Sequence, residues 1–404
     1  MSDHDTVPEG ADPDEDRHQD RHAARVSPGP GEAHRQAGDR ARRGTPPSAA
    51  PDAAHRAAPV DHRPGEAGHR AHRTAPEGAD PDHHPGRPRP AAPHPVDPGE
   101  VREVRGFWQG LGLPGLVDVH THFMPERVLR KVWGYFDALG PLTGGVEWPI
   151  TYRHEEDERT ALLRAFGVRA FTSMLYPHKP GMARWLNDWA AGFARRTPDC
   201  LHTATLFPEP DAEAYVREAV EDGARIFKAH VQVGAYDPAD ERLDAAWGLL
   251  AEAGVPVVIH CGSGPAPGAH TGPEPVARVL ARHPRLRLVV AHLGMTEYEE
   301  FLGLAERYTE VRLDTTMAFT DFSERLAPFP RRALPRLAAL GDRVLLGTDF
   351  PNIPYPYAHQ LRALERLGLG DAWLRAVCHD NAARLFGLVP ARTAPGAPEP
   401  GGRS

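Results

Sequence analysis

Short apolar runs alternate with longer amphipathic stretches along the chain between residues 115 and 386. The runs are rich in valine, leucine and isoleucine, which is typical of buried parallel strands. We expect eight strands, at 115–122, 168–176, 201–207, 224–231, 255–261, 285–293, 310–316 and 343–349. The longer stretches place apolar residues at helical spacing. They predict helices at 181–196, 211–221, 239–253, 274–283, 296–307, 331–340, 357–368 and 371–386.

Strands that are each followed by helical sequence favour a (β/α)8 barrel, the TIM barrel of the α/β class. An open doubly wound sheet is the alternative. No glycine-rich phosphate loop follows the first predicted strand, which counts against a nucleotide-binding version of such a sheet. We therefore expect one barrel domain spanning residues 106–390.

The first hundred residues differ in composition from the rest of the 404-residue chain. They contain no Leu, Ile, Phe, Tyr or Trp, but they hold 17 of the 43 prolines and 11 of the 23 histidines. Such a segment cannot bury enough apolar surface to offset the entropy of ordering it. We expect residues 1–105 to be a disordered N-terminal extension and residues 391–404 a disordered C-terminal tail. The motif PEGADPD, at 8–14 and again at 76–82, indicates low-complexity duplication.

The connection between the first two strands, residues 123–167, is long and rich in aromatic residues. A loop of this length in a compact domain is usually functional. It could form a lid or a wall over the mouth of the barrel. Alternatively, its aromatic residues only pack the insertion onto the barrel.

Several classes of protein do not fit the sequence. The net charge of −8 gives no indication of nucleic-acid binding, and no run of eighteen apolar residues predicts a membrane span. Three cysteines do not make a disulfide framework, so we expect a reducing, cytoplasmic compartment. We expect a small-molecule substrate as the partner, no nucleic acid and no membrane, and we allow for a homodimer.

The first predicted strand ends in two histidines one residue apart, His120 and His122, with Asp118 before them. Side chains alternate between the two faces of a strand, so these three residues should share one face. Two imidazoles on one face can bind the same ion, because nitrogen donors suit zinc and other first-row metals. A pair of hydrogen-bonded polar residues at a strand end is the alternative interpretation.

Other predicted strands carry polar residues at matching positions. The C-terminal ends of barrel strands converge on one face, where active sites form. The residues concerned are Lys228 and His230 on the fourth strand, His260 on the fifth, His292 on the sixth and Asp349 on the eighth. Chance does not readily place histidines at this many strand ends, so the set as a whole favours a metal site.

The chemistry of this set is consistent with metal-assisted catalysis. The two histidines of the first strand, together with His260 and Asp349, provide three nitrogens and one oxygen and leave room for a water. Zinc bound in this way lowers the pKa of the water towards about 7. Asp349 can accept a proton from that water. His292 can orient the water or polarise the substrate, and it can act as acid or base near neutral pH.

Five motifs resemble those of the amidohydrolase superfamily. They are VDVHTHFMP (117–125), VVIHCG (257–262), VVAHLG (289–294), LLGTDFPNIPYPY (345–357) and NAARLFGL (381–388). The resemblance fits best the amidohydrolase-related branch, which includes metal-dependent hydrolases and aminocarboxymuconate-semialdehyde-type decarboxylases. It implies metal ligation by His120, His122, His260 and Asp349, and a catalytic role for His292. It also implies that Asp118 is a buried support.

Lys228 and the number of metal ions are linked in this superfamily. In binuclear members a lysine on the fourth strand is carbamylated and bridges two metals. In the amidohydrolase-related branch one metal is the commoner state, so we expect one ion, preferably zinc, while two ions or another divalent metal remain alternatives. Lys228 and His230 could instead contact the substrate. A lysine paired with a carboxylate is the purely structural interpretation of Lys228.

Other candidates have weaker support. Tyr176, His178 and Lys179 follow the second strand, and His270 lies in a Gly/Pro-rich loop after the fifth, so any of them could reach the mouth of the barrel. Cys261 follows His260 and should face away from a metal, so we do not expect it to be a nucleophile.

The resemblance and the intact ligand set favour an enzyme over a barrel that has lost its chemistry. We expect a metal-dependent hydrolase that activates water to attack an amide, ester or lactone. The alternative is a metal-dependent, non-oxidative decarboxylase, a carbon–carbon lyase acting on an aromatic or muconate-type acid.

Overall fold

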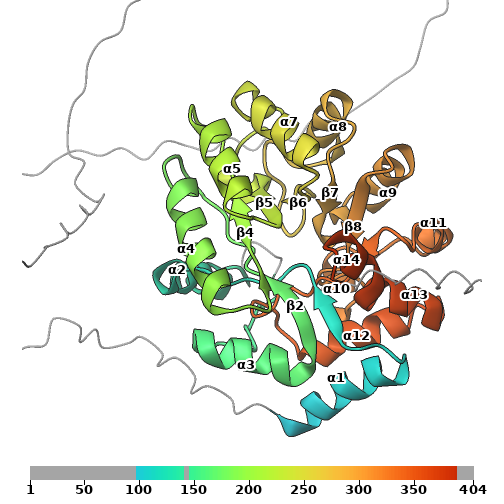
Figure 1. The fold of residues 1–404 in the computed structure, drawn as a ribbon. Coiled ribbons are helices and arrows are strands. Elements are labelled where there is room, and N and C mark those ends of the chain that lie inside the picture. The colour runs from blue at the N-terminus through green and yellow to red at the C-terminus, as the bar shows by residue number, and fades with distance from the viewer. Residues whose placement is uncertain (1–96, 141–144, 389–404) are drawn as a thin grey trace, which may run out of the picture. The chain divides into compact units, whose positions relative to one another are not determined.

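The computed structural model describes residues 97–140 and 145–388, which form a ring of parallel strands with helices on its outside (Figure 1). The expected tails at 1–96 and 391–404 lie outside the described residues. The strands are β1 (Leu116–Asp118), β2 (Val168–Thr172), β3 (Cys200–Leu201), β4 (Thr203–Thr205), β5 (Ile226–His230), β6 (Val257–His260), β7 (Leu288–Val290), β8 (Val311–Asp314) and β9 (Val344–Leu345).

All eight predicted strands are present, although their regular parts are shorter than predicted. β3 and β4 are two pieces of the predicted third strand, separated at His202. The strands pair in parallel, in the order β1-β2-β3 and β4-β5-β6-β7-β8-β9. The ring closes just beyond β1 and β9, where the Val119 amide donates to the Leu346 carbonyl at 2.9 Å. The expectation of a (β/α)8 barrel is therefore confirmed.

The alternation of side chains along β5 and β6 separates the interior of the barrel from its outer layer. Ile226 and Val258 belong to a buried cluster inside the ring, whereas Phe227 packs in the larger cluster between strands and helices. Further along each strand the inward positions become polar. They are Lys228 and His230 on β5 and His260 on β6, and His230 and His260 are direct register partners. The apolar interior therefore ends where these polar residues begin.

The helices surround this ring and confirm the predicted helices, with some displaced ends. They are α1 (Pro98–Gly110), α2 (Glu126–Asp137), α3 (Glu156–Phe166), α4 (Ala183–Arg196), α5 (Ala212–Glu221), α6 (Val231–Gly234), α7 (Asp244–Ala253), α8 (Pro273–Arg282), α9 (Tyr298–Arg307), α10 (Asp321–Leu326), α11 (Leu334–Ala339), α12 (Tyr357–Glu365), α13 (Asp371–Arg375) and α14 (Asn381–Leu385). The predicted helix at 371–386 is divided, because a π-helical turn at Ala376–Asp380 separates α13 from α14. Ala382 of α14 and the following Phe386 pack into the cluster inside the ring.

The long connection after β1 contains two helices, α2 and α3, that the sequence analysis did not predict. Its aromatic residues are mostly buried: the Trp148 ring lies 5.0 Å from Phe136 and 4.7 Å from Phe322, centroid to centroid. The Trp148 indole also donates to the carbonyl of Asn352, at 2.7 Å, in the segment that follows β9. These contacts favour the packing interpretation of the aromatic residues.

The predicted domain boundary at residue 106 falls inside helix α1, so the expectation that all of 1–105 is disordered is wrong for its last residues. The helix begins at Pro98, where the Asp97 side chain accepts a hydrogen bond from the Gly99 amide at 2.8 Å. A cap of this kind followed by proline is a typical helix start. Removing residues 1–105 would therefore cut through a packed helix.

Helix α1 is held against the barrel by Trp108. The Trp108 side chain is buried, and its indole donates to the Phe166 carbonyl at 2.9 Å. Gly167, which follows α3 with φ +85°, has no Cβ, and an added Cβ would lie 2.7 Å from the Trp108 ring. Glycine at position 167 therefore leaves room for the Trp108 ring.

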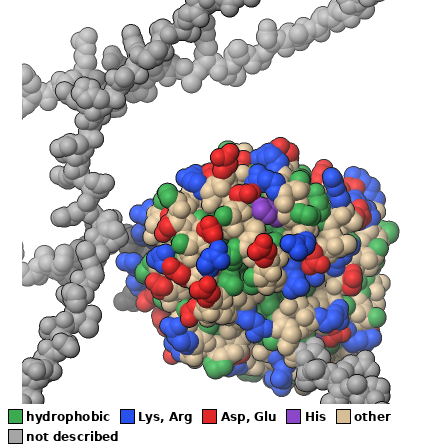
Figure 2. Space-filling view, turned by 45° about the horizontal axis from the view of Figure 1, so that its top comes forward, with side chains coloured by type: hydrophobic (Ala, Val, Ile, Leu, Met, Phe, Trp, Pro, Cys, Tyr) green, Lys and Arg blue, Asp and Glu red, His purple; other side chains and the backbone are tan. Residues whose placement is uncertain are grey.

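Two surface properties of the described part bear on partners. Among residues 97–140 and 145–388, no helix combines the length and the apolar character that crossing a membrane requires. On the face drawn in Figure 2, acidic and basic side chains are intermixed.

Replacing Trp108 by alanine should lower the free energy of unfolding by ~3–5 kcal/mol, because the change leaves a cavity under α1. Urea unfolding followed by circular dichroism measures the effect. Gln109→Ala, an exposed position on the same helix, is the control and should change stability by less than about 0.5 kcal/mol. Equal stabilities of the two variants would show that α1 contributes little to the barrel.

Candidate metal centre

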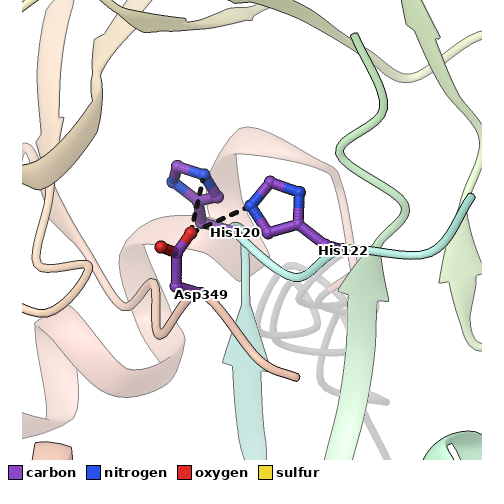
Figure 3. Close-up of side chains that lie close together, drawn as sticks. All are labelled: His120, His122 and Asp349. Atoms are coloured by element: carbon purple, nitrogen blue, oxygen red, sulfur yellow. Dashed lines mark hydrogen bonds and ion pairs between the residues drawn. The ribbon is translucent and has the colours of Figure 1, made fainter. Parts of the chain in front are cut away.

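Three predicted ligand residues meet at one end of the barrel. Figure 3 shows the Asp349 carboxylate between the rings of His120 and His122. Asp349 Oδ1 lies 2.9 Å from His122 Nε2 and 3.4 Å from His120 Nε2. All three side chains are buried. Two nitrogens and one oxygen therefore converge on a single small volume.

Backbone hydrogen bonds bring these residues together. The Asp349 amide donates to the His120 carbonyl at 2.9 Å, and the His122 amide donates to the Phe350 carbonyl at 2.6 Å. Asp349 has a left-handed backbone, with φ 74°, which aspartate tolerates better than most residues. The extended segment after β1 is thus joined to the segment after β9 on either side of the site.

The hydrogen bonds of His122 determine which of its nitrogens is free. Its Nδ1 lies 2.5 Å from the Met174 carbonyl oxygen, which can only accept, so Nδ1 carries a proton. In the neutral ring Nε2 is then a lone pair, and it faces the Asp349 carboxylate, which is also an acceptor. Two acceptors at 2.9 Å need a cation between them, either a proton on Nε2 or a metal ion.

His120 is arranged in the same way by a carboxylate that the sequence analysis missed. Its Nδ1 lies 2.9 Å from Oδ2 of Asp314, the last residue of β8. Burial, and then the nearby Lys228, lower the pKa of His120 to about 3, so its ring is neutral at pH 7. Its proton is therefore on Nδ1, and the Nε2 lone pair faces the site.

These observations show that the donor set fits a divalent metal. Metal-binding histidines typically donate their second ring nitrogen to a carboxylate or a carbonyl, as His120 and His122 do here. Burial raises the pKa of Asp349, but the hydrogen bond and charge of His122, with His292 and His120, lower it below the usual range. An anionic carboxylate opposite two imidazole nitrogens matches the ligand preferences of zinc and its neighbours.

The other predicted histidines form an adjoining row of rings. The His292 ring centroid lies 5.2 Å from that of His120 and 4.7 Å from that of His260. His260 stacks on His230 at 4.2 Å, and Tyr176 lies 4.5 Å beyond His230. His292 and Tyr176 are only half-buried, so they border the open side of the site.

His260 lies near the three-residue group but outside it. Its Nε2 is 3.1 Å from the Gly264 carbonyl, in the loop after β6. His260, the predicted fourth ligand, is therefore not among the residues whose ligand atoms converge. Its ring lies next to that of His292, which in turn lies next to that of His120.

Lys228 lies deep in the barrel rather than at the mouth. Its side chain is fully buried, and its Nζ is 3.0 Å from His120 Nε2. Burial lowers the pKa of Lys228 to about 8, although the carboxylates of Asp314 and Asp349 act in the opposite direction. The lysine thus places a cationic group directly beside a candidate ligand nitrogen.

Asp118 is a buried support, as expected. Its carboxylate accepts hydrogen bonds from the Thr348 hydroxyl at 2.7 Å, the Tyr357 hydroxyl at 2.9 Å and the His120 amide at 3.1 Å. Burial raises the pKa of Asp118 to about 7 against the effect of these donors. The carboxylate therefore holds the backbone of His120 rather than a ligand.

The structure gives different outcomes for the candidates with weaker support. His178 and Lys179 are exposed and His270 is half-buried, and among the described residues no hydrogen bond, ion pair or ring contact joins any of them to the site. Cys261 is buried and unpaired, as are the other two cysteines. The analysis of strand ends overlooked Asp314, although it ends β8 just as His260 ends β6.

A TIM barrel with a histidine–carboxylate metal centre at the C-terminal ends of its strands defines a class of metal-dependent enzymes. The family model described as amidohydrolase matches residues 117–388. The chain therefore belongs to the amidohydrolase family, whose superfamily includes hydrolases and decarboxylases. No curated protein matches the sequence.

The chain is similar to several solved structures at low sequence identity. An uncharacterized TIM-barrel protein from Bordetella bronchiseptica has 20% identity and a TM-score of 0.56, and the match covers 68% of this chain and 98% of that chain. A 5-carboxyvanillate decarboxylase from Sphingomonas paucimobilis matches with 14% identity and a TM-score of 0.47, covering 68% and 99% of the two chains. A probable 2-pyrone-4,6-dicarboxylic acid hydrolase from Acinetobacter baumannii matches with 13% identity and a TM-score of 0.47, again covering 68% and 99%.

Protein purified without chelator should contain about one equivalent of a divalent metal, and Asp349→Ala should reduce this to below about a tenth of an equivalent. The expectation follows from the loss of the only anionic oxygen in the three-residue group. Elemental analysis measures the metal. Asp321→Ala, at an exposed carboxylate on α10, is the control and should retain the metal. Wild-type protein that takes up no metal on reconstitution would contradict the interpretation of the site.

Proposed function

We propose that the protein is a metal-dependent hydrolase that uses water to cleave an amide, ester or lactone. The observation that carries the proposal is the convergence of His120 Nε2 and His122 Nε2 on Asp349 Oδ1, at 3.4 and 2.9 Å, which forms a donor set that fits a divalent cation. A half-buried imidazole, His292, lies beside this point with its ring 5.2 Å from that of His120. A cation site and a titratable group side by side are the two parts that hydrolysis of a carbonyl compound needs.

His120, His122 and Asp349 would hold the metal, and His260 would join them as a fourth ligand by leaving the Gly264 carbonyl. Zinc is the preferred ion, because the donor set is mainly imidazole nitrogen. When bound, such an ion lowers the pKa of water and polarises a carbonyl group. One ion per chain is proposed.

The protein's own groups then handle the protons. The ionised Asp349 carboxylate can accept a proton from the attacking water. Burial lowers the pKa of His292, so its ring is mainly neutral at pH 7 and can take a proton or pass one to the leaving group. Tyr176 and His230 border the same space and would contact the substrate.

One observation favours a second candidate function. The buried Lys228 ammonium, 3.0 Å from His120 Nε2, could hold a substrate carboxylate for non-oxidative decarboxylation. The two functions differ in their products. Incubating the zinc-loaded protein with a panel of lactones, esters and amides, and with aromatic and muconate-type acids, distinguishes hydrolysis from release of carbon dioxide.

The variant His292→Asn should keep its metal and lose activity by about a hundredfold or more, because an amide cannot act as acid or base. Metal content and turnover of the best substrate in the panel are measured together. His283→Asn, at a histidine paired with Asp244 outside the site, is the control and should remain active. Loss of metal along with activity would instead identify His292 as a ligand.

The variant Lys228→Ala should retain a full equivalent of zinc and be impaired in substrate affinity or rate. A single ion held by His120, His122 and Asp349 needs no bridging lysine. Zinc content before and after reconstitution measures the outcome, with the exposed Lys131→Ala as control. Two equivalents in wild type, with a fall in the variant that short carboxylates rescue, would replace this proposal with a bridging carbamate.

A further inference from the structure

The carboxylate of Asp314 joins two residues of the site that come from different strands. Asp314 ends β8 and is fully buried. Its Oδ2 lies 2.9 Å from His120 Nδ1. Its Oδ1 accepts from the backbone amides of His292, at 2.9 Å, and Thr316, at 3.0 Å. One oxygen thus serves the candidate metal ligand and the other serves the candidate acid–base residue.

The first oxygen determines the tautomer of His120. A carboxylate can only accept, so the imidazole must carry its proton on Nδ1. The Nε2 atom is then left as a lone pair, and it lies on the side of Asp349, at 3.4 Å, and Lys228, at 3.0 Å. The opposite tautomer would put a hydrogen on Nε2, and this nitrogen could not bind a metal.

The second oxygen holds the turn that carries His292. The backbone of His292 has φ 55°, and that of Leu293 has φ 53°. Non-glycine residues rarely occupy this left-handed region, so consecutive residues need support from their surroundings. The hydrogen bond from the His292 amide to Asp314 supplies one such contact and keeps the ring near His120.

We propose that Asp314 is a positioning residue, which sets the metal-binding nitrogen of His120 and the location of His292 through a single carboxylate. This inference rests on the proposed function, because it takes His120 as a metal ligand and His292 as the acid–base residue. Asp314 acts through these two residues and does not itself face the space between His122 and Asp349.

The substitution Asp314→Asn separates the two tasks, because an amide has only one accepting oxygen. If that oxygen stays with the amides of His292 and Thr316, the NH2 group faces His120 Nδ1 and favours a proton on Nε2. If the amide is reversed, its NH2 group faces two backbone N–H donors. Either arrangement loses one of the contacts that Asp314 makes.

The first measurement is the nitrogen chemical shifts of the His120 ring in metal-free protein labelled with 15N-histidine. The signals are identified as those missing from His120→Asn. Wild type should show the proton on Nδ1, and Asp314→Asn should move it to Nε2. A wild-type ring protonated on Nε2 alone would overturn the proposal, and this result can be obtained even if the variant fails to fold.

The second measurement is zinc affinity, obtained by competition with a chelator. Asp314→Asn should bind zinc about 10–100-fold more weakly than wild type. Asp244→Asn is the matched control, because it makes the same change opposite the ring of His283, 2.9 Å away, and should bind zinc as wild type does. Equal affinities and unchanged ring signals in Asp314→Asn would overturn the proposal. If wild type binds no zinc, the proposed function fails, and the ring signals of His120 still decide the role of Asp314.

Discussion

The site depends on the hydrogen bonds that join the chain after the first strand to the chain after the last. Val119 donates to Leu346, Asp349 to the carbonyl of His120, and His122 to Phe350. The first of these bonds closes the barrel, and the other two place a carboxylate against two imidazoles that lie more than two hundred residues earlier in the chain. The same junction between the two segments therefore closes the barrel and assembles the candidate metal centre.

Buried carboxylates connect this junction to the rest of the fold. Asp118 takes its donors from Thr348, Tyr357 and the His120 backbone, while Asp314 takes its donors from the segment after β1 and from the turn after β7. A buried acceptor without a partner costs about 1–3 kcal/mol, so each carboxylate stabilises only the arrangement that satisfies it. The site is thus surrounded by groups that tolerate one geometry, and this geometry orients the Nε2 lone pair of His120 inward.

The alternation of short apolar runs with amphipathic stretches was enough to predict the barrel and to place His120, His122 and Asp349 at its strand ends. Buried parallel strands are apolar throughout, so a histidine at the end of such a strand is conspicuous, as at His230 and His260. Asp314 was missed because it is a single acid between Arg312 and two threonines, so it does not stand out from an apolar run as the histidines do. Its role depends on β8 lying beside the turn after β7, which is a property of the closed ring. Helix α1 was missed because it begins in a segment whose composition is otherwise typical of disorder.

The detail that strand patterns could not predict is where each histidine nitrogen points. His120 and His122 sit in an extended segment beyond β1, and partners from distant elements, Asp314 and the Met174 carbonyl, fix their proton positions. At His260, whose strand position was predicted correctly, the carbonyl of Gly264 accepts from Nε2, so Nδ1 is the nitrogen left with a lone pair. Residue type and strand position therefore identify a possible ligand, whereas the partner of the second ring nitrogen decides whether the first is available to a metal.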